Sequence, residues 1–197
     1  MKIYLIRHGQ TEGNTLKRYI GVTDEPLLPE EKNRLKLKNY PHVELIFTSP
    51  LLRCRQTAEA IYPKRNAIIV PNLSECDFGV FENKNWKELN GSVQYQEWIE
   101  SNGTMAFPGG EDPKDFKERS CRAFEEIIYE CYRRGAHSAA IVTHGGTIMS
   151  IMGRYVQPQR EFYHWHVDNG NGYEVEIEPS CWTAEIKILQ EVHALKP

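Results

Sequence analysis

Two histidines, two arginines and one glutamate follow short apolar runs at four separate places in the chain. The runs are Ile3 to Ile6, Leu45 to Phe47, Ala67 to Val70 and Ala139 to Val142, and the polar residues after them are Arg7 with His8, Arg53, Glu75 and His144. This set of side chains suits phosphoryl transfer. A phosphate monoester carries close to two negative charges, which guanidinium forks and imidazoles bind well.

A neutral imidazole is also a nucleophile. One histidine would attack phosphorus while the other donates a hydrogen bond to its oxygens, and a carboxylic acid near Glu75 would protonate the leaving alkoxide. Arg53 falls in the first turn of a predicted helix, where its charge opposes the helix dipole unless a bound anion offsets it. A single histidine after a strand is more often structural than catalytic, so it is the convergence of these residues that indicates a site.

The four apolar runs predict strands buried on both faces of a parallel sheet, because they are short and do not alternate with polar residues. The carboxyl ends of such strands meet at one edge of the sheet, where ligands usually bind. Near the C-terminus, residues 173–178 and 184–188 alternate apolar with charged side chains, which predicts antiparallel strands at the sheet edge. The fold class we expect is α/β, a three-layer α/β/α sandwich with a mostly parallel central sheet and an antiparallel edge.

Helical patterns separate these runs. Ser49-Pro50 predicts an N-cap followed by proline at the first helical position, with the helix ending near Tyr62. Asp112-Pro113 predicts a second capped helix, longer and with one apolar face. A further helix is predicted to begin after His144.

Length and charge restrict the class of protein. The chain has 197 residues, which favours one domain over residues 1–197. Lys and Arg number 24 against 27 Asp and Glu, a net charge of −3 that argues against a nucleic-acid or membrane partner but allows a local anion pocket. Five scattered cysteines form neither a disulfide framework nor a zinc signature, so we expect a cytoplasmic protein. The apolar run at the N-terminus is too short for a signal peptide or a membrane span.

Four ordered motifs resemble those of the histidine phosphatase superfamily, also called the phosphoglycerate mutase-like family. They are Leu5-Ile6-Arg7-His8-Gly9-Gln10-Thr11 with Asn14, Ser49-Pro50-Leu51-Leu52-Arg53-Cys54-Arg55-Gln56-Thr57-Ala58, Leu73-Ser74-Glu75 with Phe78-Gly79, and Thr143-His144-Gly145-Gly146. The order and spacing match over roughly the whole chain, which makes the resemblance specific.

The resemblance implies a role for each matching residue. His8 is expected to be the nucleophile that becomes phosphohistidine, and Glu75 the proton donor to the leaving group and later the base that activates water. The phosphate-binding residues implied are Arg7, Asn14, Arg53, His144 and Gly145. No metal or other cofactor is expected. Arg55 lies off the family position, and we expect it on the helix surface.

The chain departs from the family pattern at two turns. The segment Pro29-Glu30-Glu31-Lys32 lacks the usual glycine, and Asn83 stands where relatives often have glycine. Neither position belongs to the expected chemistry, so only the local turn geometry is in question.

Mutases of the family that this chain resembles generally carry a longer, arginine-rich insert between the acid and the second histidine. The corresponding segment here, 78–113, is short and contains no arginine. We therefore expect a phosphatase that acts on small phosphate monoesters. The aromatic residues of this segment predict either a cap over an apolar or planar leaving group or a small hydrophobic core. Two alternatives remain: mutase-type phosphoryl transfer and a phosphate-binding protein without catalysis. A metallohydrolase is disfavoured, because the arginines would repel a divalent cation.

Within the family, Glu75-Cys76-Asp77-Phe78-Gly79, Phe107-Pro108-Gly109-Gly110-Glu111 and Tyr163 to Gly170 resemble the α-ribazole phosphatase branch, which shares its pattern with broad-specificity phosphatases. α-Ribazole 5′-phosphate is therefore a candidate substrate. His164 and His166 have the spacing of one strand face, which predicts an exposed strand pair or a contact with ligand. The oligomeric state does not follow from the sequence.

Overall fold

The computed structural model describes the backbone of residues 1–197 and every side chain except that of Glu191. One six-stranded sheet, in the order β3-β2-β4-β1-β5-β6, forms its centre. The strands are β1 (Lys2–Arg7), β2 (Leu45–Thr48), β3 (Ile68–Ile69), β4 (Ser138–Thr143), β5 (Gly172–Glu176) and β6 (Gln190–Leu195). The first four pair in parallel, while β5 pairs antiparallel with both β1 and β6.

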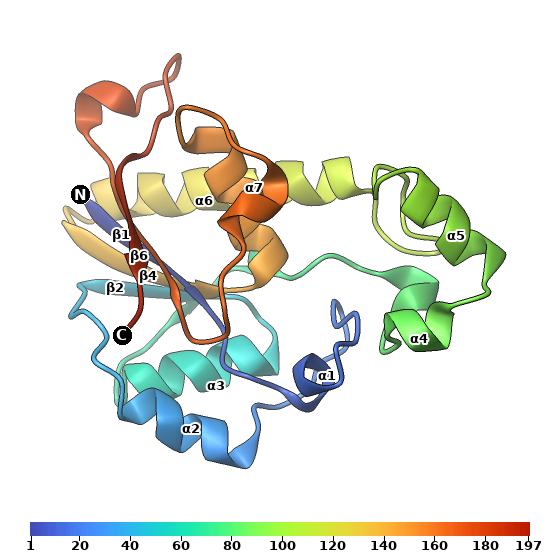
Figure 1. Ribbon diagram of the computed structural model, residues 1–197. Coiled ribbons are helices and arrows are strands. Elements are labelled where there is room, and N and C mark those ends of the chain that lie inside the picture. Colours follow the sequence, from blue (N-terminus) through green and yellow to red (C-terminus); the bar gives the residue numbers. More distant parts are fainter.

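Helices cover both faces of this sheet (Figure 1). The α-helices are α1 (Glu12–Thr15), α2 (Pro29–Lys36), α3 (Leu52–Ile61), α4 (Trp86–Leu89), α5 (Val93–Glu100), α6 (Pro113–Arg133) and α7 (Gly145–Tyr155). Helices α2 and α3 lie on one face and α6 and α7 on the other, whereas α4 and α5 lie beyond the end of the sheet. The expected α/β/α sandwich with an antiparallel edge is confirmed.

Two hydrophobic cores hold the three layers together. Alternate residues of one strand point to opposite faces, so Ile3 and Leu5 of β1 pack in the core under α6 and α7, while Tyr4 and Ile6 pack in the core over α3. The predicted apolar face of α6 is buried, and its N-cap is Asp112, whose side chain accepts a hydrogen bond from the Lys114 N–H.

Three local predictions are wrong. Helix α3 begins at Leu52 and not at an N-cap Ser49; the Leu52 N–H donates instead to the Asp24 carboxylate at 2.6 Å. The predicted strand 184–188 is instead a bend that pairs back on residues 181–183 through an isolated bridge between Trp182 and Lys187. Ile186 is 48% exposed, so the alternation there does not face a core. The last strand begins only at Gln190, after Trp182 has packed on α6 and α7.

The third concerns His164 and His166. They lie in and after a 3-10 helix, Phe162–Trp165, and not on a strand. Trp165 is buried in the core beneath α7, and the tight turn that brings it there leaves both histidines exposed.

At the departure from the family pattern, Asn83 has φ of +56°, a left-handed conformation that asparagine tolerates better than most residues. No helix in the described residues is long and apolar enough to cross a membrane.

Candidate active site

The ends of β1 and β4 bring the two motif histidines together. The strands are parallel neighbours with Arg7 opposite Thr143, so His8 and His144 leave the sheet side by side. The backbone N–H of His8 donates to the Thr143 carbonyl at 2.9 Å. The centroids of the two imidazole rings are 5.2 Å apart in an edge-on arrangement. Both residues are buried. The convergence expected from the parallel sheet is therefore present.

The imidazole of His8 is held in one tautomer. Its Nδ1 lies 2.7 Å from the Gly9 carbonyl oxygen. A carbonyl only accepts, so Nδ1 carries the proton and Nε2 keeps its lone pair. Burial and the positive charges of Arg53 and Arg7 lower the pKa of His8 well below the ordinary histidine value, against the opposing effect of the Gly9 bond. These contacts favour a neutral His8 imidazole whose lone pair is on Nε2.

His144 occupies the N-cap position of α7 and is fully buried, and its side chain makes no capping hydrogen bond. Its Nε2 shares a 2.7 Å hydrogen bond with the Ser49 hydroxyl, which explains why Ser49 is not the helix cap expected from its position before Pro50. Burial, Arg53 and His8 lower the pKa of His144 well below the ordinary value. Sequence analysis missed Ser49 as a partner of His144, although it lies inside a motif.

Arg53 lies in the first turn of α3 with no exposed surface. Its guanidinium donates to the carbonyls of Gly21 and Thr23, both at 2.8 Å. Each Nη group therefore has an acceptor in the loop at residues 20–23. The buried Nε has no protein partner. A buried N–H of this kind calls for an acceptor, and an anion beside the histidines would provide one.

Arg7 ends β1, and its guanidinium contacts the segment 166–168. Its Nη1 donates to the Val167 carbonyl at 2.7 Å, and its buried Nε also has no protein partner. Burial lowers the pKa of Arg7, while Glu75 and Asp168 raise it, and an arginine remains protonated throughout. Arg7, His8, Arg53 and His144 are called the His–Arg cluster below.

Glu75 follows the 3-10 helix Pro71–Leu73, which comes directly after β3. Its carboxylate accepts from the N–H groups of Gly146 at 3.0 Å and Cys76 at 3.1 Å. A Cβ at Gly146 would collide with this carboxylate, so glycine is needed there. Arg119 of α6 fixes the backbone by donating to the Glu75 carbonyl at 3.0 Å. Burial raises the pKa of Glu75, against the effect of these N–H groups and of Arg53 and Arg7.

The remaining motif residues lie at the margin of the site. Asn14 belongs to the capping box of α1, and its Oδ1 accepts from the Asn169 side chain at 3.1 Å. Gly145 begins α7, and a Cβ there would lie 3.4 Å from Arg7 Nε. Arg55 is exposed on α3, as expected. Asn169 lies within the stretch Tyr163 to Gly170 that resembles the α-ribazole phosphatase branch, but the sequence assigned it no role of its own.

A cavity of about 670 Å³ opens beside the cluster. Arg7, Glu75, Gly145 and Gly146 line it, and His8, Arg53 and His144 are not among its lining residues. Its aromatic side chains, called the aromatic wall below, are Tyr19, Phe78, Trp98, Phe107, Phe116, Phe162 and Tyr163.

The aromatic residues of the segment 78–113 divide between the two expected roles. Three of them, Phe78, Trp98 and Phe107, line the cavity and also pack in a small hydrophobic core. Phe81 and Tyr95 pack in that small core but do not line the cavity. Trp86 is 55% exposed.

Several cationic residues at the cavity were missed by sequence analysis. Lys114 and Lys117 lie in the first turns of α6, and Arg154 lies in the last turn of α7. Arg154 is paired with Glu118 at 2.5 Å, and Lys117 lies 4.7 Å from the centre of the Phe162 ring. His166 also lines the cavity, 3.4 Å from Arg7 Nη1, whereas His164 does not. Spacing alone did not distinguish the two lysines and Arg154 from a solvated helix face, whereas a contact with ligand was one of the two roles expected for His166. In the described part of the chain, no group of three or more His, Cys, Asp or Glu side chains is arranged to hold a metal ion.

Known proteins of similar sequence and structure carry related names. A broad-specificity phosphatase from Saccharomyces cerevisiae is 30% identical over 77% of this chain and 69% of its own length. A 2,3-bisphosphoglycerate-dependent phosphoglycerate mutase from Rhizobium etli is 32% identical over 76% of this chain and 77% of its own length. The crystal structure of the α-ribazole phosphatase from Shigella flexneri superposes with a TM-score of 0.78 at 25% identity, covering 97% of this chain and 96% of that one.

The sequence profile of the histidine phosphatase superfamily (branch 1) matches residues 3–187, nearly the whole chain. The chain belongs to this branch of the histidine phosphatase superfamily.

Proposed function

We propose that this protein hydrolyses small-molecule phosphate monoesters through a phosphohistidine at His8. The observation that carries the proposal is the neutral His8 imidazole, buried beside His144 and two arginines, with Glu75 at the adjoining cavity. The two arginine Nε groups without protein partners supply charge-assisted donors for the phosphoryl oxygens.

The chemistry has two steps. First, His8 Nε2 attacks phosphorus, the bond from phosphorus to the leaving oxygen breaks, and protonated Glu75 transfers its proton to that oxygen. Second, Glu75, now ionised, takes a proton from water as the water oxygen attacks phosphorus; the phosphorus–nitrogen bond breaks and inorganic phosphate leaves. Arg7, Arg53 and His144 stabilise the charge on the equatorial oxygens in both steps. Asn14 and the N-terminus of α7 at Gly145 complete the proposed phosphate-binding site.

The aromatic wall favours a substrate whose leaving group is planar or apolar. Its rings line the cavity into which the leaving group must extend from the phosphoryl group. α-Ribazole 5′-phosphate, whose base is a planar heteroaromatic ring, is the first natural ester to test. We further propose that residues 1–197 form one domain with the segment 78–113 as its cap, and that the protein acts in the cytoplasm, consistent with its five free cysteines.

Turnover of p-nitrophenyl phosphate in the presence of EDTA tests the phosphatase proposal. We expect release of nitrophenol that persists in chelator, together with acid-labile phosphate trapped on the protein and absent from His8→Ala. No turnover by the wild type between pH 4 and 9 would leave a phosphate-binding role in its place, and loss of turnover in EDTA would indicate a metallohydrolase.

Mutase activity is the second candidate. Lys114 and Lys117 place positive charge at the cavity, where the carboxylate of a phosphoglycerate would be attracted. A panel containing aryl phosphates, α-ribazole 5′-phosphate and both phosphoglycerates, assayed for inorganic phosphate and for the isomeric ester, separates the two reactions. Faster isomerisation than phosphate release would favour the mutase.

A further inference from the structure

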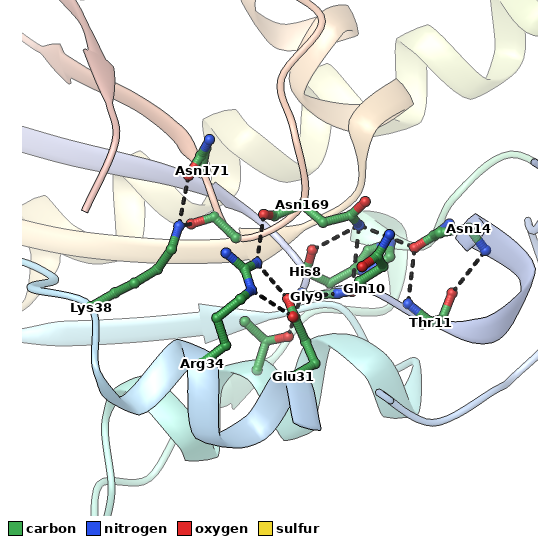
Figure 2. Close-up of polar contacts among 12 residues, drawn as sticks. His8, Gly9, Gln10, Thr11, Asn14, Glu31, Arg34, Lys38, Asn169 and Asn171 are labelled. Carbon is green, nitrogen blue, oxygen red and sulfur yellow. Dashed lines mark hydrogen bonds and ion pairs between the residues drawn. The ribbon is translucent and has the colours of Figure 1, made fainter. Parts of the chain in front are cut away.

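The peptide group between Gly9 and Gln10 is held at both ends. Its carbonyl oxygen accepts the His8 Nδ1–H at 2.7 Å. Its N–H, on the opposite side of the same peptide plane, donates to Oε1 of Glu31 at 2.9 Å (Figure 2). One rigid peptide therefore separates the Glu31 carboxylate from the imidazole of His8.

Glu31 is a buried carboxylate in the first turn of α2, only 2% exposed. Arg34, one helical turn later, binds it with Nε and Nη2, both at 2.6 Å. A Cβ at Gly9 would lie 2.8 Å from Glu31 Cγ, so the carboxylate reaches this peptide because position 9 has no side chain. The segment around Glu31 is the one that lacks the family's usual glycine.

The same ion pair is tied to the chain on the other side of His8. Arg34 Nη2 donates to the Asn169 carbonyl at 3.1 Å, and the Asn169 side chain donates to the His8 carbonyl at 3.0 Å (Figure 2). Lys38 donates to Asn171 Oδ1 at 2.8 Å, anchoring the same loop to α2. The backbone around His8 is thus held between α2 and the loop at 169–171.

We propose that Glu31, oriented by Arg34, is a positioning residue that fixes the tautomer and direction of the His8 imidazole through the Gly9–Gln10 peptide. This inference rests on the proposed function, in which His8 is the nucleophile. A negative charge at the N–H end of a peptide polarises the group, which makes its carbonyl oxygen a stronger acceptor. The Gly9 oxygen then holds the proton on Nδ1 and keeps the Nε2 lone pair available, the role that a partner of the second ring nitrogen generally plays.

Ionisation of the carboxyl group is consistent with this role. Burial raises the pKa of Glu31, but the hydrogen bonds from Arg34 and from the Gln10 N–H outweigh it, so the pKa lies below the ordinary value. The charged groups that face it are Arg34 and, farther away, Lys38, both of α2. Arg34 is 47% exposed, and an ion pair with one exposed partner contributes little to stability, which leaves room for a role in function.

The substitution Glu31→Gln tests the charge while keeping the shape of the side chain. With p-nitrophenyl phosphate we expect kcat to fall about tenfold or more, because the nucleophile loses its orientation. KM should change less than about twofold, since Glu31 lies behind the peptide and outside the cavity lining. Glu30→Gln, the exposed carboxylate next to it, is the matched control and should behave as the wild type.

A spectroscopic measurement separates positioning from simple loss of folding. In ¹⁵N-labelled wild type, the His8 ring resonances, assigned by comparison with His8→Ala, should show Nδ1 protonated and Nε2 unprotonated at pH 7. In Glu31→Gln the population protonated at Nε2 should increase. Because this readout needs no turnover, it tests the inference even if the wild type proves inactive on every ester, an outcome that would contradict the proposed function alone.

A double variant guards against misfolding of the single one. Glu31→Gln with Arg34→Met removes both charges, so Arg34 is not left without its partner. We expect it to unfold at nearly the wild-type temperature and to remain slow. Wild-type kcat in the folded double variant, or an unchanged His8 tautomer in Glu31→Gln, would overturn the proposal, because the ion pair would then serve only the fold.

Discussion

The His–Arg cluster and the aromatic wall adjoin each other but are built differently. Every member of the cluster stands at a strand end or in the first turn of the following helix, with neighbours fixed by the parallel sheet. His8, Arg53 and His144 are almost fully buried, and Arg7 is partly exposed. The wall gathers residues from positions 19 to 163, and its exposure ranges from 4% at Phe116 to 69% at Tyr163. Under the proposed function, the chemistry takes place in the cluster and the wall selects the substrate.

The charge balance of the two regions differs as well. The cluster places two guanidinium groups around two imidazoles with low pKa values, which favours a dianionic phosphoryl group and leaves the histidines neutral. The wall is mainly apolar, with lysines at its margin. The net charge of −3 is therefore an average over unlike regions and says nothing about this site.

The largest effect is expected in the cluster. His8→Ala should reduce kcat for every phosphate ester by at least about 10⁴-fold, because no nucleophile remains. The measurement is steady-state turnover together with trapping of phosphoenzyme. His42→Ala, at an exposed histidine, serves as control. Substantial turnover by His8→Ala would remove His8 from its proposed role and with it the contrast between the two regions.

Glu75→Gln should separate substrates by leaving group. For an alkyl phosphate, kcat should fall about 10²- to 10³-fold, because the alkoxide must be protonated as it departs. For p-nitrophenyl phosphate, whose leaving group is a stable anion, the loss should stay below about tenfold. Comparing the two esters in parallel assays makes this measurable. If both lose activity equally, Glu75 has a structural or phosphate-binding role instead.

The pH dependence should follow the opposite pKa shifts of the two groups. The pKa of His8 is lowered, so the nucleophile stays neutral as the pH drops below about 6.5, where an ordinary histidine protonates. The pKa of Glu75 is raised, so the acid keeps its proton above the range of an ordinary glutamate and loses it as the pH rises further.

For an alkyl ester, kcat/KM should therefore decline on the acid side only below about pH 6.5 and on the alkaline side as Glu75 ionises. The profile of Glu75→Gln, measured on the same ester, should lack the alkaline decline due to Glu75. An acid limb at the ordinary histidine value would contradict the proposed burial effect on His8.

The smallest effect is expected in the wall. Tyr163→Ala should raise KM for an aryl phosphate about threefold, through loss of one exposed aromatic contact, and leave kcat unchanged. Tyr129→Ala is a matched control, since Tyr129 is 70% exposed on α6 and lines no part of this cavity. A fall in kcat for Tyr163→Ala would mean that the wall also orients the reacting atoms, which would weaken the distinction between the two regions.

Much of the site was predictable because the sheet itself converts sequence order into position. Parallel strands end at the same edge, so Arg7, His8 and His144 had to meet once β1 and β4 were neighbours. The prediction of a strand from periodicity was wrong at 184–188, where the alternating apolar side chains have no core to pack against. The apolar residues of 184–188 alternate as in a strand, yet Ile186 is 48% exposed and pairing with β5 begins later, at Gln190.

The sequence by itself determined the α/β class, the positions of the strand ends and the identity of the histidines and arginines there, because these follow from local runs and short motifs. Only the tertiary structure decided which side chains touch them. Ser49 binds His144 instead of capping a helix, and Glu31 reaches the Gly9–Gln10 peptide only because Gly9 lacks a side chain. Such contacts depend on the packing of elements far apart in the chain, and no local pattern encodes that packing.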